Sequence, residues 1–195
     1  MMENTYAWIQ EVALPVTLVH NARGDERFIT AMSGDNMLWR AKEPPVAWDW
    51  LDPTVAYYGI GPENAEPSVW FVGEPIGQEE RSWKDLVMAV GRQQRLLTPM
   101  TESIVDAIRQ PVRVAVFTIP SCPKCAQAVR LIGAMALRNP KISLYAVDLD
   151  KQQGLIAKWN LQTLPAFMVN DTLSVMAANE WILAQAIQNA SVEAG

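Results

Sequence analysis

The sequence predicts an α/β fold in two similar halves, each with a mixed central sheet flanked by helices. In the C-terminal half, short runs of β-branched and aromatic residues alternate with segments whose apolar residues recur at helical spacing, in the order β-α-β-α-β-β-α. The N-terminal half shows a similar order of elements, with weaker signals. A chain of 195 residues that is 50% hydrophobic is long enough and apolar enough to bury two such cores.

Periodicity and helix-breaking residues place the elements of the C-terminal half. Strands are expected at residues 112–118, 142–150, 167–169 and 173–176, and helices at residues 125–137, 153–159 and 180–187. Asn139-Pro140 ends the first helix, because proline cannot continue a helix and restricts the residue before it. Asn170-Asp171 supplies the turn between the last two strands.

The N-terminal half has weaker signals of the same kind. Strands are expected at residues 16–20, 55–59 and 69–72, helices at residues 27–38 and 82–90, and a turn at residues 74–77. A further helix at residues 98–110 is expected to join the halves as a packed element. We therefore expect one domain at residues 1–97 and a second at residues 98–195.

Composition and charge argue against several functions. The 16 lysine and arginine residues are scattered among 21 acidic residues, for a net charge of -5, so the sequence has no basic footprint for nucleic acid or an anionic membrane. No window approaches the roughly 18 apolar residues that a membrane-spanning helix needs, and the N-terminus lacks a basic segment followed by an apolar run. We therefore expect a cytoplasmic protein.

Cys122 and Cys125 are the only cysteines in the sequence, so thiol chemistry is confined to one C-x-x-C pair. In a reducing compartment, such a pair beside a β-α-β pattern is more often redox-active or metal-binding than a structural staple. The sequence has no second cysteine pair, and His20 is its only histidine, so further zinc ligands are lacking. A redox role is therefore favoured over a structural disulfide or a metal site.

The expected position of Cys122 at a helix start makes it the candidate nucleophile. Unsatisfied backbone N–H groups and the positive end of the helix dipole stabilise a thiolate there, and Lys124 adds a positive charge. Cys125, one turn further along, is expected to be buried and to resolve a mixed disulfide formed at Cys122. Pro165 is expected to be cis, which would expose the backbone of Leu164 to an extended substrate.

These residues resemble motifs of the thioredoxin superfamily. Cys122-Pro123-Lys124-Cys125 is similar to its redox motif, and Leu164-Pro165 to its cis-proline element. The whole chain more closely resembles the N-terminal domain of the alkyl hydroperoxide reductase flavoprotein subunit, which has two fused thioredoxin-like folds and one active C-x-x-C. The stretches that carry this resemblance are residues 71–79, 121–125, 137–142 and 164–170. Protein disulfide oxidoreductases with two C-x-x-C pairs are a more distant comparison.

The resemblance also implies roles for individual residues. The substrate-binding positions would be Ser121, Pro123, Lys124, Leu164 and Pro165. Thioredoxin's buried aspartate is replaced by Val116, so a proton-shuttling acid must come from elsewhere, and Glu79 occupies the matching position in this subgroup. The first fold has no cysteine, although Asp52-Pro53-Thr54 keeps a proline, so we expect that fold to be structural and catalytically silent.

The implied function is that of a protein disulfide oxidoreductase in cell redox homeostasis, with a redox-active disulfide and no other cofactor or metal. Because the sequence holds no counterpart of the flavin domains, electrons would come from a separate flavin-dependent disulfide reductase. They would pass, in the reductive direction, to a peroxiredoxin or another disulfide protein. The alternatives are a non-catalytic binding or assembly module with an unreactive Cys122, and a chaperone-like adaptor that uses some of the eight tryptophans for docking.

Overall fold

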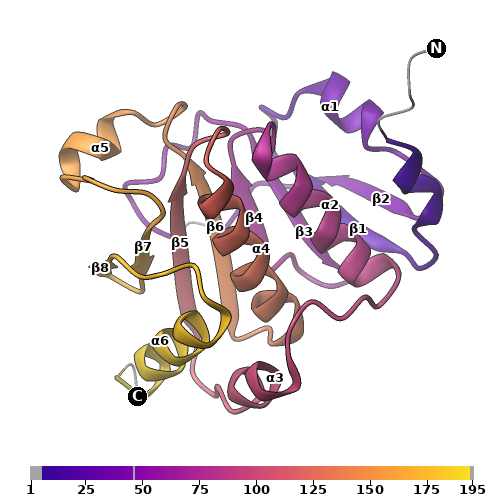
Figure 1. The fold of residues 1–195 in the computed structure, drawn as a ribbon. Coiled ribbons are helices and arrows are strands. Elements are labelled where there is room, and N and C mark those ends of the chain that lie inside the picture. The colour runs from indigo at the N-terminus through magenta and orange to yellow at the C-terminus, as the bar shows by residue number, and fades with distance from the viewer. Residues whose placement is uncertain (1–5, 46, 194–195) are drawn as a thin grey trace.

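The computed structural model describes residues 6–45 and 47–193, which form one mixed sheet with helices on its faces (Figure 1). The strands are β1 (Val16–His20), β2 (Met37–Ala41), β3 (Tyr57–Pro62), β4 (Val69–Val72), β5 (Val112–Thr118), β6 (Ile142–Asp148), β7 (Ala166–Val169) and β8 (Thr172–Ser174). The helices are the 3-10 helix η1 (Ala7–Glu11), α1 (Glu26–Ala31), α2 (Gln78–Gly91), α3 (Pro99–Asp106), α4 (Pro123–Arg138), α5 (Gly154–Lys158) and α6 (Glu180–Glu193).

The two halves of the sheet repeat one strand order. Across the sheet, β2-β1-β3-β4 in the N-terminal half is followed by β6-β5-β7-β8 in the C-terminal half. In each half the first two strands along the chain are parallel, and the third and fourth are antiparallel to the strands before them in this order. The prediction of two similar α/β folds in tandem is confirmed.

β4 and β6 join the two folds into a single sheet. They pair in parallel, from Val69 opposite Leu144 to Val72 opposite Val147. β5 and β6 read as nearly continuous apolar runs because both of their faces are covered. Since the carboxyl ends of β4, β5 and β6 lie at the same edge of the sheet, residues from both folds meet there.

Most helices cover one face of the sheet. α2 and α4 lie side by side across it, and α6 lies beside α4 (Figure 1). Trp83 and Leu86 of α2 and Ile132 of α4 are fully buried in this layer. Gly133 of α4 allows a close approach, because a Cβ atom there would lie 2.7 Å from the Cδ1 atom of Leu86. The main core therefore packs one long helix from each fold against the shared sheet.

The opposite face is covered by α5 and by residues 47–56 of the N-terminal fold. Trp48 stacks on Trp50 with ring centroids 5.2 Å apart. Trp50 lies 5.6 Å from the ring of Phe117 on β5 and 6.2 Å from that of Trp159 after α5. A segment of the first fold thus packs on the sheet of the second through its tryptophan rings.

The prediction of a helix at residues 27–38 was wrong for the second half of that segment. α1 ends at Ala31, and residues 37–41 form β2, which pairs in parallel with β1. Gly34 and its polar neighbours favour a turn, and a Cβ atom at Gly34 would lie 2.5 Å from a methyl group of Ile9. Pairing with β1 and packing on η1 outweighed the helical periodicity of the segment.

β1, β4 and β5 have the predicted bounds, and the other predicted elements are present with shifted ends. β3 begins two residues later than the predicted strand at residues 55–59, and β6 ends at Asp148 rather than at residue 150. α2 begins at Gln78, before the predicted start at residue 82, and α6 continues past residue 187 to Glu193. Two elements end earlier than expected: α3, which was predicted at residues 98–110, and β8, which was predicted at residues 173–176. The 3-10 helix η1 was not predicted.

Candidate active site

The dithiol lies where β5 leads into α4. Cys122 is the N-cap residue of α4, with extended backbone, and its N–H donates to the carbonyl oxygen of Ile119 over 3.0 Å. Its sulfur accepts the backbone N–H of Cys125 at 3.1 Å, and Pro123 fills the first helical position, where no N–H is needed. The Cys122 sulfur therefore faces the positive end of the helix dipole.

A disulfide joins the two cysteines, with an S–S distance of 2.05 Å and a Cα–Cα distance of 5.3 Å. Cys122 is partly exposed, whereas Cys125 is completely buried. Ser121, Pro123 and Lys124 are exposed around the accessible sulfur. An external thiol or disulfide can therefore approach Cys122 but not Cys125.

The Leu164–Pro165 peptide bond is cis and lies at the same edge of the sheet. Ala166, the first residue of β7, pairs with Phe117 of β5, so Pro165 is level with the end of β5 that leads to Cys122. Pro165 is buried and Leu164 is partly exposed. The sequence positions expected to bind substrate thus lie at the end of β5 that leads to the disulfide.

Two hydrogen bonds that flank Glu79 on α2 hold the start of this helix against the redox motif. The N–H of Gln78 donates to the carbonyl oxygen of Pro120 over 2.8 Å, and the hydroxyl of Ser82 donates to the carbonyl oxygen of Ala126 over 2.7 Å. Pro120 precedes the C-x-x-C motif by two residues and Ala126 follows it directly. The first turn of α2, from the N-terminal fold, is therefore packed on both ends of the redox motif.

The Glu79 carboxyl group is almost completely buried, at 2% exposure, and its Oε1 atom has no hydrogen-bond partner among the described residues. Burial raises the pKa of Glu79 from 4.5 to about 7. Within this shift, the nearby hydroxyl of Thr118 acts in the opposite direction to burial, and the negative charge of Asp148 adds to the rise as the smallest of the three contributions to the pKa. A buried carboxyl group with a pKa in this range can exchange protons at neutral pH.

Gly77 makes this approach of α2 possible. Its φ of 61° is in the left-handed region, and a Cβ atom there would lie 2.6 Å from the carbonyl oxygen of Pro120. A side chain at this position would push the start of α2, and Glu79 with it, away from the dithiol.

Asp148 is a second buried acid of the site, and sequence reasoning missed it. It ends β6, is 1% exposed and lies opposite Thr118 of β5. Its Oδ1 atom accepts the N–H of Asp150 at 2.9 Å, and its Oδ2 atom has no partner among the described residues. Burial raises its pKa. The signal in the sequence that could have identified Asp148 is an aspartate at the end of an apolar strand next to β5.

The corresponding position of the first fold holds no redox group. The N-cap residue of α1 is Asp25, whose carboxylate accepts the N–H of Arg27 at 2.7 Å and forms an ion pair with its guanidinium at 3.1 Å. Pro53 lies four residues before β3, and the cis peptide bond at Pro165 is the only one that the described residues contain. The first fold contributes Glu79 to the site but no thiol.

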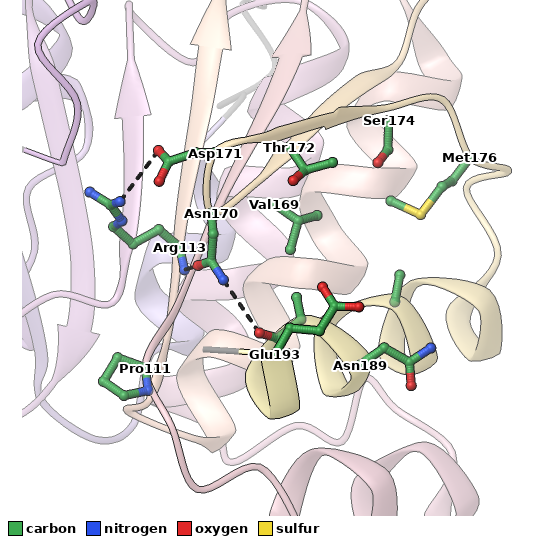
Figure 2. Close-up of a pocket in the computed structure, with 12 residues that line it drawn as sticks. Pro111, Arg113, Val169, Asn170, Asp171, Thr172, Ser174, Met176, Asn189 and Glu193 are labelled. Atoms are coloured by element: carbon green, nitrogen blue, oxygen red, sulfur yellow. Dashed lines mark hydrogen bonds and ion pairs between the residues drawn. The ribbon is translucent and has the colours of Figure 1, made fainter. Parts of the chain in front are cut away.

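A cavity of about 590 Å³ lies elsewhere, between the β7–β8 turn and α6 (Figure 2). Arg113, near the start of β5, donates its backbone N–H to the Asn170 side chain over 3.1 Å and forms an ion pair with Asp171 at 3.6 Å. Figure 2 shows these residues at one end of the cavity and Glu193 of α6 along it. Because the dithiol follows the opposite end of β5, this cavity is separate from the redox site.

Two further properties bear on function. Across residues 6–45 and 47–193, no group of three or more histidine, cysteine, aspartate or glutamate side chains is placed to hold a metal ion. Among the helices of the same residues, none has both the length and the apolar character needed to cross a membrane.

Comparisons with known proteins agree with this architecture. The structure superimposes on a mutant form of the alkylhydroperoxide reductase protein AhpF from Enterococcus faecalis with a TM-score of 0.77 and 17% sequence identity, over 93% of this chain and 98% of that chain. A protein disulfide oxidoreductase from Aeropyrum pernix gives a TM-score of 0.77 at 16% identity, over 99% of this chain and 96% of that chain. These likenesses show the tandem thioredoxin-like fold. No curated protein sequence matches the chain.

A family model described as thioredoxin matches residues 78–191. This match spans more than half of the chain and includes α2, both cysteines and the cis proline. The chain therefore belongs to the thioredoxin family.

Proposed function

We propose that this protein is a thiol–disulfide oxidoreductase that exchanges two electrons with disulfides of other proteins through Cys122 and Cys125. One observation carries the proposal: a disulfide at a helix start joins an accessible sulfur to a buried one, beside a cis proline. A structural disulfide has no need of such an asymmetry in exposure. Reactive cysteines, in contrast, lie in partly exposed, electropositive surroundings.

In the reductive direction, the cycle begins with the dithiol form. The Cys122 thiolate attacks one sulfur of a substrate disulfide, forming a mixed disulfide and releasing the other substrate sulfur as a thiolate. Cys125 then loses its proton and attacks the sulfur of Cys122, which releases the second substrate thiolate and forms the Cys122–Cys125 disulfide. The two electrons of the dithiol now lie on the substrate thiols, and an external reductant must restore the dithiol.

Glu79 is the proposed acceptor of the Cys125 proton. Cys125 is completely buried, so bulk water cannot reach its thiol to take this proton. The helical turn that carries Glu79 is packed against the same motif. A carboxyl group with a pKa of about 7 can take up a proton at neutral pH and release it again in the next cycle.

The substrate is expected to bind as an extended segment. Leu164 is partly exposed at the end of β5 that leads to Cys122, and a strand of the substrate could pair with its backbone there. Ser121, Pro123 and Lys124 form the exposed rim on the other side, and Lys124 favours approach of a substrate thiolate or acidic group.

For the physiological partners, we propose a flavin-dependent disulfide reductase as electron donor and a peroxiredoxin or similar disulfide protein as acceptor. The likeness to an alkylhydroperoxide reductase protein supports this choice, and the reductive direction suits a reducing compartment such as the cytoplasm. The redox-active disulfide would serve without a further cofactor.

Reduction of insulin disulfides in the presence of dithiothreitol tests the proposal. The wild-type protein should accelerate the reaction, and Cys122→Ser should reduce it to the uncatalysed rate. Lys141→Ala, a change at an exposed residue that precedes β6 at the end remote from the dithiol, is the control and should keep full activity. Equal rates for the wild-type protein and Cys122→Ser would sink the idea and favour a non-catalytic binding module. The midpoint potential then decides direction, with ~-270 mV indicating a reductase and ~-120 mV an oxidant.

A further inference from the structure

Two buried carboxyl groups from different folds share one compartment around Thr118, at the end of β5 that leads to the dithiol. Glu79 comes from α2 of the first fold and Asp148 from the end of β6 in the second. They are 2% and 1% exposed, and each has one carboxyl oxygen without a hydrogen-bond partner among the described residues. Such groups are costly to bury in the charged form, so their joint presence calls for an explanation.

Thr118 connects this compartment to the redox motif. It is completely buried, lies opposite Asp148 in the β5–β6 pairing, and its hydroxyl is near the Glu79 carboxyl group. Its carbonyl oxygen accepts the N–H of Leu149 at 2.9 Å, which fixes the end of β6 against the end of β5. Cys122 follows four residues later in the chain, so the compartment lies at the end of β5 that leads to the redox motif.

Gly73 provides the room for Asp148. It follows β4 with a φ of 117°, and a Cβ atom there would lie 2.7 Å from the Cβ atom of Asp148 and 3.2 Å from its Oδ2 atom. The first fold thus leaves a space that the Asp148 side chain fills. Glu79 on α2 and the space at Gly73 after β4 both belong to the first fold, where it meets the second.

We propose that Asp148 is a positioning residue for the redox reaction, acting through Glu79: its negative charge makes the Glu79 carboxylate a stronger base for the Cys125 thiol. This inference rests on the proposed function, in which Glu79 exchanges a proton with Cys125.

The physical basis is repulsion between like charges in a site of low dielectric constant. Burial raises the pKa of both carboxyl groups, and the charge of Asp148, once it is ionised, opposes ionisation of Glu79. The other groups around the pair are few. On β5 the nearby group is the hydroxyl of Thr118, and after β4 the nearby residue is Gly73, which has no side chain. On the segment of Asp148 itself, the charged neighbours are Asp150 and Lys151, which have opposite charges.

The direct test is the titration of Glu79 in the oxidised protein, followed by NMR of its side-chain carboxyl carbon. Asp148→Asn keeps an oxygen that can accept the Asp150 N–H but removes the charge. The midpoint of the Glu79 titration should fall by roughly 0.5 to 1 pH unit in this variant. Asp148→Ser, which also removes the charge, should give a fall in the same direction. Asp150→Asn removes an exposed charge two residues away and should leave the midpoint within about 0.2 unit.

The second readout is the pH profile of disulfide reduction. The acid limb of the profile should move to lower pH in Asp148→Asn, and Asp148→Asn should cause no shift when Glu79→Gln is already present, because the effect passes through Glu79. An unchanged or raised Glu79 midpoint in both Asp148 variants would overturn the inference. The titration needs no turnover, so this outcome is distinct from failure of the proposed function, which would appear as inactive wild-type protein.

Discussion

The indole N–H of Trp48 donates a hydrogen bond to the carbonyl oxygen of Asn170, 122 residues later, over 2.9 Å. The same N–H is 3.1 Å from the carboxylate of Asp171, and the guanidinium of Arg113 lies 4.9 Å from the centre of a Trp48 ring. A segment of the first fold is thereby attached to the β7–β8 turn of the second. The folds are joined through side chains on this face as well as through the β4–β6 pairing.

Trp48→Phe should therefore destabilise the whole chain. The variant loses the indole hydrogen bond and part of a buried ring, which together should lower the free energy of unfolding by roughly 1 to 3 kcal/mol. Urea denaturation followed by circular dichroism would measure the change. Trp181→Phe on α6 is the matched control, because that ring is 54% exposed, and its effect should stay within about 0.5 kcal/mol. Equal effects of the two substitutions would contradict the inter-fold role of Trp48.

Gly133 sets the distance between the long helices of the two folds. A Cβ atom at this position would lie 2.7 Å from the Cδ1 atom of Leu86, which is completely buried. Gly133→Val should push α4 from α2 and lower the free energy of unfolding by roughly 1 to 3 kcal/mol. Because α2 carries Glu79, the displacement should also slow disulfide reduction.

The double variant Gly133→Val, Leu86→Ala checks this explanation. Removing the Leu86 side chain makes room for the valine, so the cost of Gly133→Val should be smaller in this background than in the wild-type protein. A cost that is the same in both backgrounds would show that contacts other than the one with Leu86 explain the effect.

The sequence was sufficient to predict elements whose signal is local. β5 and α4 have strong apolar patterns, and Asn139-Pro140 ends α4 as predicted. β2 was missed because an edge strand of five residues depends on its pairing with β1, which a short window does not contain.

The candidate site shows the same division between local and distant information. The spacing of Cys122 and Cys125 is visible in the sequence, and the exposure of each follows from its place at the helix start. Glu79 could be proposed only from a family resemblance, because its burial depends on contacts of α2 with another fold. Asp148 escaped notice since its burial depends on the register of β5 with β6 and on the space at Gly73.

Cys125→Ser should trap a covalent intermediate. With no thiol to resolve it, the mixed disulfide between Cys122 and a substrate cysteine should persist, while turnover falls to the uncatalysed rate. Mass spectrometry and non-reducing electrophoresis after incubation with an oxidised protein substrate would detect the adduct. The reciprocal variant, Cys122→Ser, should form no adduct because Cys125 is completely buried. Adducts on Cys125 in that variant would reverse the assigned order of attack.

Glu79→Gln should change how stability depends on pH. The native state raises the pKa of Glu79 from 4.5 to about 7, so it holds the proton more tightly than the unfolded chain does. The resulting stabilisation is complete below the unfolded value and is lost as pH rises through the native value. Glutamine cannot ionise, so the variant keeps its stability over this window.

Relative to the wild-type protein, Glu79→Gln should therefore gain on the order of 3 kcal/mol in free energy of unfolding between about pH 4 and about pH 8. Other titrating groups are common to both proteins and cancel in the difference. Urea denaturation of the oxidised proteins across this range would measure the gain. Glu80→Gln, at the neighbouring and less buried residue of the same helical turn, should not reproduce it. A flat difference between Glu79→Gln and wild type would mean that Glu79 ionises in the folded protein as readily as in the unfolded chain, and it would then be a poor acceptor for the Cys125 proton.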